Sequence, residues 1–205
     1  MSVYPLMLDG TAIRALVVGG GPVAARKVEG LLAAGASVRI LATALSPAVR
    51  ELHPNARLTI LPPRAYTADA IEDATFVIAA TDDPSVNAAI AADARTRGCL
   101  VNVVDDPSAG TCVTPAVHRA EGLVIAVSAG GVPGAAVRVR DAVGARFDHR
   151  YAAAVQRLSA LRSLFLRRGD EGRARWATAQ QAIVGDDFCE SVESGAFERR
   201  AAEWA

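Results

Sequence analysis

Short apolar runs and longer stretches with helical spacing alternate through the first hundred residues. The runs are four or five residues long and end at turn-forming residues, which predicts strands. The run at Phe76–Ala80 is wholly apolar, a pattern typical of strands buried on both faces of a parallel sheet. The predicted strands are Ala15–Val18, Val38–Ala42, Leu58–Leu61, Phe76–Ala80 and Leu100–Val104.

Two of the stretches between these strands predict helices. From Val23 to Ala34 apolar residues recur at three- and four-residue intervals, and Gly35 stands where a helix usually ends. A second helix is expected from Pro84 to about Arg97, since proline is favoured in the first turn of a helix. Strands that alternate with helices predict the α/β class, with a Rossmann-type doubly wound parallel sheet.

The pattern changes after Asp105. A short strand is predicted at Leu123–Val127, a loop at Gly130–Gly134 and a helix at Ala135–Arg146. Beyond these, helical spacing dominates to the end of the chain. The expected helices there are Tyr151–Arg168, Ala174–Ile183 and a weaker one that runs to Trp204.

We therefore expect three parts. Residues 1–112 form the Rossmann domain, residues 113–148 form a small α+β segment, and residues 149–205 form a helical C-terminal domain. The middle part is too short to bury an apolar face alone, so it is expected to need a partner. The role of the helical part stays open.

A glycine-rich motif follows the first predicted strand and opens the first predicted helix. It reads Gly19-Gly20-Gly21-Pro22-Val23-Ala24, which fits the GxGxxA fingerprint of dinucleotide-binding sites. Gly19 permits the tight turn, Gly21 allows the backbone to approach a pyrophosphate, and Ala24 allows close helix packing. Pro22 and Val23 begin the helix whose N-terminus would bind the phosphates, and NAD is the expected cofactor.

The acidic residue that binds the ribose in many such sites is missing after the second strand. That strand ends at Ala42, and Thr43 and Ala44 follow. Thr43 and the neighbouring backbone are candidates for the ribose contact. Arg39 leaves a phosphorylated ribose conceivable, so the residues do not decide between NAD and NADP, and we favour NAD.

Polar residues follow two of the buried strands, at the edge where ligands bind in parallel sheets. Thr81 and Asp82 come after one strand, and the other carries Asn102 and ends at Asp105. Asp82 or Asp83 could instead cap the helix that begins at Pro84, and Asp105 and Asp106 could instead form a turn before Pro107. Both interpretations stay open.

Composition narrows the function classes. The 22 basic residues balance the 22 acidic ones, so no overall charge favours a nucleic acid or an anionic membrane. Neither a leader peptide nor a membrane span is expected, because no window reaches the roughly 18 apolar residues that a span needs. Three cysteines without CxxC spacing, and three scattered histidines, predict neither a disulfide framework nor a bound metal, and we expect a cytoplasmic protein.

Four separated motifs occur in a consistent order between about Leu6 and Arg146. They are Gly19-Gly20-Gly21-Pro22-Val23-Ala24-Ala25-Arg26-Lys27, Ala79-Ala80-Thr81-Asp82-Asp83, Asn102-Val103-Val104-Asp105 and Ala126-Val127-Ser128-Ala129-Gly130-Gly131. Together they resemble the precorrin-2 dehydrogenase family, which includes the dehydrogenase and ferrochelatase part of siroheme synthases. The order is more specific than any one motif.

The resemblance implies NAD-dependent oxidation of precorrin-2 to sirohydrochlorin, and some members also insert Fe2+ as a second substrate. The family's essential aspartate falls on Asp105, which would act as a base. The serine of the family's SxGG stretch falls on Ser128, near the tetrapyrrole pocket. Family members form homodimers through the segment that here spans about residues 113–146. No methyltransferase domain is expected to follow.

Precorrin-2 carries many carboxylates, so basic side chains are candidates to bind it. His118 and Arg138 are the main candidates beside Asn102 and Ser128, and Arg119 and Arg140 are further ones. Pro133-Gly134 and the sequence Val137-Arg138-Val139-Arg140 depart from the family pattern. These departures bear on substrate binding and iron insertion more than on NAD binding.

Two other functions compete with this interpretation. A non-catalytic NAD-sensing module would share the glycine-rich loop but would need neither Asp105 nor the Ser128 motif. A dehydrogenase for a small substrate would have a catalytic His, Lys or Tyr at the sheet edge, where this chain has carboxylates, amides and hydroxyls. We rank the tetrapyrrole dehydrogenase first.

Overall fold

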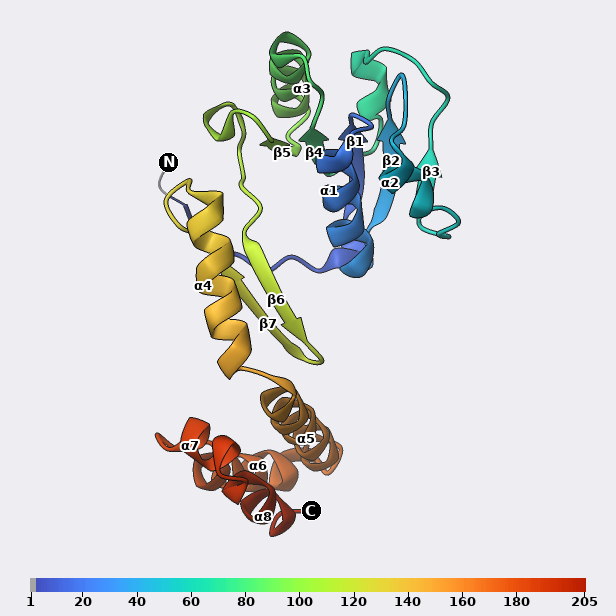
Figure 1. Cartoon of the computed structure of the whole chain (residues 1–205). Helices are drawn as coiled ribbons and strands as arrows, with labels where there is room; N and C mark the ends of the chain where they lie inside the picture. The colour runs from blue at the N-terminus through green and yellow to red at the C-terminus, as the bar shows by residue number, and fades with distance from the viewer. Residues whose placement is uncertain (1–2) are drawn as a thin grey trace. The chain divides into compact units, whose positions relative to one another are not determined.

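The computed structural model describes residues 3–205. It divides between Thr114 and Pro115 into two compact units, which Figure 1 draws in blue to green and in yellow-green to red. The first unit is an α/β domain and the second combines a small sheet with helices. The further division of the second unit at residue 148 stays a prediction.

The first unit is built on one parallel sheet. Its strands are ordered β3-β2-β1-β4-β5, the doubly wound order of a Rossmann domain, so the predicted fold class is confirmed. All five predicted strands occur, each within a residue of its expected bounds. The strands are β1 (Arg14–Val18), β2 (Ser37–Leu41), β3 (Leu58–Ile60), β4 (Phe76–Ala79) and β5 (Leu100–Val103).

Helices cover both faces of this sheet. The helices α1 (Pro22–Ala33) and α2 (Pro47–Glu51) pack against one face with Val17 and Ile78, and α3 (Pro84–Thr96) packs against the other with Val77. Burial of each such aliphatic side chain contributes about 1.5–3 kcal/mol. Three short 3₁₀ turns complete the unit: Gly10–Ala12, Ala68–Ile71 and Pro107–Ala109.

The helix α2 was not predicted, because five residues are too few for a periodic pattern. Its signal is local: the Ser46 side chain accepts a hydrogen bond from the Val49 N–H, and Pro47 occupies the first turn. The connection between β3 and β4 carries only the 3₁₀ turn Ala68–Ile71.

The second unit begins with an antiparallel pair, β6 (Ala116–Ala120) and β7 (Leu123–Val127), followed by α4 (Pro133–Arg146). The sequence predicted β7 but missed β6, because His118 and Arg119 interrupt its apolar pattern. The predicted loop at Gly130–Gly134 was wrong in its last two residues. Pro133 takes the first helical position, where its missing N–H costs nothing.

The remaining helices are α5 (His149–Leu166), α6 (Gly169–Ile183), α7 (Phe188–Glu193) and α8 (Ala196–Ala202). They share a core with Phe165 and Phe197 at its centre. The helix expected from Ala174 begins five residues earlier, since Asp170 and Glu171 favour the first turn of a helix. The weak helix expected to run to Trp204 is divided by Gly195, whose φ of 76° no helix can include.

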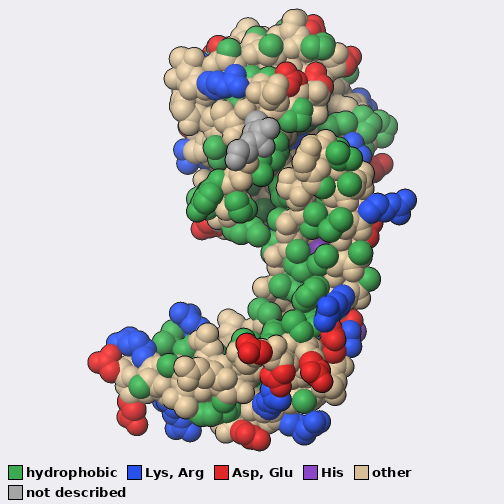
Figure 2. Space-filling view, turned by 90° about the vertical axis from the view of Figure 1, so that its left-hand side faces the viewer, with side chains coloured by type: hydrophobic (Ala, Val, Ile, Leu, Met, Phe, Trp, Pro, Cys, Tyr) green, Lys and Arg blue, Asp and Glu red, His purple; other side chains and the backbone are tan. Residues whose placement is uncertain are grey.

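The surface carries both charge types. On the face seen in Figure 2, acidic and basic side chains are interspersed over the helices of the second unit rather than gathered by sign. None of the helices within residues 3–205 is both long and apolar enough to cross a membrane.

Candidate active site

The carboxyl ends of the parallel strands bring most of the predicted site residues of the first unit to one edge of the sheet. Gly19 and Gly21 follow β1, and Thr43 follows β2 together with Ala44. Thr81 follows β4, and Asp105 follows β5. The chain reverses its strand order between β1 and β4, which is where doubly wound sheets bind ligands.

The glycine-rich loop is fixed by close backbone contacts. Gly19 has a φ of 126°, and a Cβ atom there would lie 2.1 Å from the Ala80 carbonyl oxygen at the end of β4. Gly20 packs as tightly against the Ala44 carbonyl and accepts a hydrogen bond of 2.8 Å from the Ser46 N–H. The loop between β1 and α1 is therefore held against the ends of both neighbouring strands.

Gly21 differs from its two neighbours because the space beside it is open. Apart from the adjoining backbone, no atom lies within 4 Å of the position that its Cβ would take, and its φ is an ordinary −81°. Gly21 is also the N-cap of α1, and no side chain caps that helix. Pro22 has no N–H, but the N–H groups of Val23 and Ala24 in this first turn adjoin open space at the positive end of the helix dipole, which fits a dinucleotide pyrophosphate.

The sequence Asp-Asp-Pro-Ser occurs at the carboxyl ends of both β4 and β5, at residues 82–85 and 105–108. In each copy the second aspartate caps the turn that follows. Asp83 accepts from the Ser85 and Val86 N–H groups, and Asp106 accepts from the Ser108 and Ala109 N–H groups. Hydrogen bonds from the serine side chain and from the turn backbone hold the pKa of both aspartates below the usual value of 3.8.

The first aspartate of each copy is left at the sheet edge. Asp82 is exposed, and Asp105 is exposed with one side-chain partner: its Oδ1 accepts a hydrogen bond of 3.0 Å from Nδ2 of Asn87. In each pair the second aspartate is therefore the cap, and the first remains a candidate site residue. The sequence did not predict a role for Asn87 of α3. The only available signal was the repeated Asp-Asp-Pro-Ser, which indicates that the ends of β4 and β5 have similar local structure.

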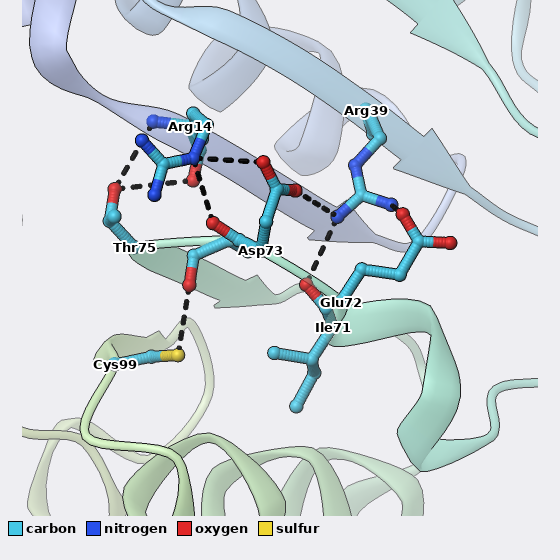
Figure 3. Close-up of polar contacts among 8 residues, drawn as sticks. Arg14, Arg39, Ile71, Glu72, Asp73, Thr75 and Cys99 are labelled. Carbon is cyan, nitrogen blue, oxygen red and sulfur yellow. Dashed lines mark hydrogen bonds and ion pairs between the residues drawn. The ribbon is translucent and has the colours of Figure 1, made fainter.

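The Arg39 side chain is engaged at the opposite edge of the sheet. Its guanidinium forms an ion pair with Glu72, a second with Asp73 at 3.4 Å, and a hydrogen bond of 3.0 Å to the Ile71 carbonyl (Figure 3). Arg14 binds Asp73 as well. These partners precede β4, at the amino edge of the sheet, so the contacts of Arg39 do not support the possibility that it binds a phosphorylated ribose.

Asn102 lies inside β5 and is only 5% exposed, whereas the residues around Asp105 reach the surface. Its Nδ2 donates to the Cys112 carbonyl, and among the described residues its Oδ1 has no hydrogen-bond partner. Nearby, Lys27 of α1 donates to the Thr114 hydroxyl, and burial lowers the pKa of this lysine. Burial raises the pKa of the Cys112 thiol.

The other predicted substrate-binding residues belong to the second unit. Ser128 follows β7 and is exposed, and Arg138 is exposed on α4. His118 of β6 is less available, because its Nε2 lies 2.9 Å from the Phe147 carbonyl and its ring packs against Gly144. Among residues 3–205 there is no group of three or more His, Cys, Asp or Glu side chains placed to hold a metal ion.

Comparison with known proteins places this geometry in a family. Siroheme synthase of Chromobacterium violaceum is 36% identical over 200 residues, which cover 96% of this chain and 42% of that protein. Siroheme synthase of Methylobacillus flagellatus is 31% identical over 201 residues, which cover 96% of this chain and 43% of that protein. Siroheme synthase 1 of Serratia proteamaculans is 41% identical over 131 residues, which cover 64% of this chain and 27% of that protein. The chain thus spans less than half the length of these relatives.

A solved structure named "SirC, precorrin-2 dehydrogenase" has the same fold. It superimposes with a TM-score of 0.75 at 24% identity, covering 98% of this chain and all of that one. The model of the family described as "Putative NAD(P)-binding" matches residues 6–116, which include the glycine-rich loop and Asp105. The chain belongs to this NAD(P)-binding family.

Proposed function

We propose that this chain is an NAD-dependent dehydrogenase that oxidises precorrin-2 to sirohydrochlorin in siroheme biosynthesis. The observation that carries the proposal is the position of Asp105. An exposed carboxylate follows β5 at the same sheet edge as the open glycine-rich loop at Gly21. A cofactor bound along that edge would place its reactive end near a group that can accept a proton.

The reaction removes two hydrogen atoms from the macrocycle. NAD+ supplies the hydride acceptor, taking two electrons and one proton from a substrate carbon. The second proton leaves as H+, and we assign its acceptance to Asp105. The products are then sirohydrochlorin, NADH and one proton. The first turn of α1 would bind the pyrophosphate, and Thr43, Ala44, Thr81 and Asp82 border the rest of the cofactor.

NAD is favoured over NADP within this proposal. The basic side chain nearest to the expected ribose in sequence, Arg39, is engaged with Glu72 and Asp73 at the opposite edge. Thr43 is exposed after β2 and can contact a ribose hydroxyl. No sequence position after β2 offers the cation that a 2′-phosphate requires before the helix α2 begins.

The substrate is proposed from the names of the relatives and from the motif that ends at Ser128. Siroheme synthases match nearly the whole chain, which includes Ser128 and Arg138. Arginine suits the carboxylates of precorrin-2, and Arg138 is exposed. We also propose the cytoplasm as the location, since Cys99, Cys112 and Cys189 are all free thiols.

A homodimer is proposed through the β6–β7 pair and α4. A two-stranded sheet is marginally stable by itself, and this one leaves Val124 of β7 41% exposed. Val132, Val137 and Val139 are exposed on and beside α4. Analytical ultracentrifugation should give twice the chain mass of 21.3 kDa, and Val139→Asp should shift the mass toward the monomer. A monomeric unaltered chain would refute this part.

Insertion of Fe2+ into sirohydrochlorin is a second candidate activity, which the resemblance to siroheme synthases suggests. We favour the dehydrogenase alone, because the α4 start at Pro133-Gly134 departs from the family pattern. Incubation of the purified chain with sirohydrochlorin and Fe2+ under nitrogen, followed by absorbance, tests for siroheme directly. Formation at the uncatalysed rate would restrict the chain to the dehydrogenase step.

The main experiment is anaerobic incubation with enzymatically made precorrin-2 and NAD+, beside Asp105→Ala. We expect NADH and sirohydrochlorin to appear in equal amounts, and kcat to fall about 10²- to 10⁴-fold in the variant, the usual contribution of a general base. NAD+ affinity should be unchanged. NAD+ binding without any turnover by the unaltered chain would instead favour the NAD-sensing module.

A further inference from the structure

Asn87 is the most completely bonded buried side chain near the site. It lies in the first turns of α3 and is 1% exposed. Its Oδ1 accepts from the Thr81 N–H at 3.1 Å and lies 2.7 Å from the Thr81 hydroxyl. Its Nδ2 donates to the Thr81 carbonyl at 3.2 Å and to Oδ1 of Asp105 at 3.0 Å. All four hydrogen-bonding positions of the amide are therefore used.

The orientation of this amide is fixed by the backbone. The Thr81 N–H can only donate and the Thr81 carbonyl can only accept, so Oδ1 must face the first and Nδ2 the second. The remaining Nδ2 proton then points at the Asp105 carboxylate. An amide N–H fixes a carboxylate without adding a countercharge. Within residues 3–205, Asn87 is the only hydrogen-bond partner of the Asp105 side chain, which leaves Oδ2 free.

We infer that Asn87 is a positioning residue for Asp105. It connects the end of β4, at Thr81, to the end of β5, at Asp105, and so sets the carboxylate relative to the loop that borders the cofactor. This inference rests on the proposed function, because it gives Asp105 the part of the proton acceptor. Asn87 is only 1% exposed, so it would act through Asp105 rather than on the substrate itself.

Replacement of Asn87 by alanine tests this inference. The loss of the Nδ2 donor frees the Asp105 side chain to rotate, and a displacement of about 1 Å can lower a rate 10²-fold. We expect kcat to fall about 10- to 100-fold in Asn87→Ala, while KM for precorrin-2 changes less than about threefold. A loss of substrate or cofactor binding would instead raise KM.

A double-mutant cycle separates positioning from general damage. In an Asp105→Asn background, Asn87→Ala should lower kcat by no further factor, because the group that it positions is gone. The matched control is Asp83→Ala, which removes the α3 cap in the same loop without touching Asp105 and should keep kcat within about twofold. A fall in kcat in Asn87→Ala that persists in the Asp105→Asn background would overturn the inference.

A second variant covers the case that the alanine fails to fold. Asn87→Asp keeps the acceptor for the Thr81 N–H but turns an oxygen toward both the Asp105 carboxylate and the Thr81 carbonyl. Combined with Asp105→Asn, it restores a donor and an acceptor between the two side chains. We expect thermal stability to recover in part in the double variant, because the hydrogen bond to the Thr81 carbonyl stays lost, and kcat to stay low. Turnover by the unaltered chain with unchanged kcat in the Asn87 variants would refute only this inference, whereas no turnover by the unaltered chain would refute the proposed function as well.

Discussion

The two edges of the parallel sheet in the first unit use polar residues in opposite ways. At the amino edge, Arg14 and Arg39 are neutralised by Asp73 and Glu72, and their donors also bind backbone carbonyls. At the carboxyl edge, Asp82 and Asp105 form no ion pair with any residue from 3 to 205, and no side chain caps the first turn of α1. The amino edge is complete without a ligand, whereas the carboxyl edge leaves donors and carboxylates available.

This difference separates stability from function within a single sheet. Changes at the amino edge should affect folding and leave cofactor binding intact. Changes at the carboxyl edge should divide according to whether the residue holds the loop or borders the open space. Gly19 holds the loop and Gly21 borders the open space, so substitutions at these two positions test the difference most sharply.

The largest effect is expected for Gly19→Ala. A side chain at a φ of 126° is strained, and its Cβ would lie 2.1 Å from the Ala80 carbonyl oxygen. Strain and overpacking together should lower the free energy of unfolding by about 2–5 kcal/mol. Chemical denaturation monitored by circular dichroism measures this loss. A variant as stable as the unaltered chain would contradict the loop geometry.

The next effect is expected for Gly21→Asp. The new side chain enters open space, so folding should be unaffected, but its carboxylate would repel the pyrophosphate at the start of α1. NAD+ affinity should fall at least about 100-fold, since like charges in contact cost several kcal/mol.

Isothermal titration calorimetry with NAD+ measures the change in affinity. The matched control is Gly30→Asp, which makes the same substitution at an open position farther along α1 and should leave the affinity within about twofold. Equal losses in both variants would mean that charge on the helix, rather than proximity to the pyrophosphate, weakens binding.

A smaller effect is expected for Arg39→Ala at the amino edge. It removes two ion pairs and a hydrogen bond from a guanidinium that is largely buried, against partners that are exposed. The free energy of unfolding should fall by about 1–2 kcal/mol. The ratio of NADP+ to NAD+ affinity should not move. A shift in that ratio would mean that Arg39 contacts the cofactor. The control is Arg57→Ala, which removes an exposed arginine at the same edge.

The smallest effect is expected for Asp83→Ala, which loses the α3 cap. Hydrogen bonds from Ser85 and Val86 lower the pKa of Asp83 in the folded chain. Its contribution is therefore present above the unfolded value of about 3.8 and is lost as the pH falls through the lower folded value. The variant should melt about 2 °C lower at pH 7, and the difference should vanish in acid. A difference that persists in acid would exclude the cap as its cause.

The sequence predicted the sheet well because its strands are buried and carry a strong apolar signal. The strand Phe76–Ala79 and the Gly19–Ala24 motif could be identified from local residue pattern and from their order along the chain. Elements with weak patterns were missed or misplaced: β6 contains His118 and Arg119, and α2 spans five residues. The cap at Ser46 stabilises α2, and pairing with β7 stabilises β6. Neither interaction produces a periodic pattern in the sequence.

The sequence predicted that the candidate residues meet at one edge of the sheet, but it did not predict which side chains hold them there. Asp105, Thr81 and the glycine-rich loop could be placed at one edge because parallel strands share a direction. The assignment of Asp83 and Asp106 to caps, and the link from Asn87 to Asp105, depend on side-chain geometry across α3 and β5. A single asparagine in a helix gives no sign of a partner 18 residues away.

A crystal structure with bound NAD+ would show whether the carboxyl edge of the first unit is the redox site. We predict the pyrophosphate at the first turn of α1 beside Gly21, and the nicotinamide ring on the side of the edge that holds Asp105. NAD+ bound elsewhere on the first unit, or with its nicotinamide turned toward Thr43 and away from Asp105, would show that Asp105 is not the proton acceptor.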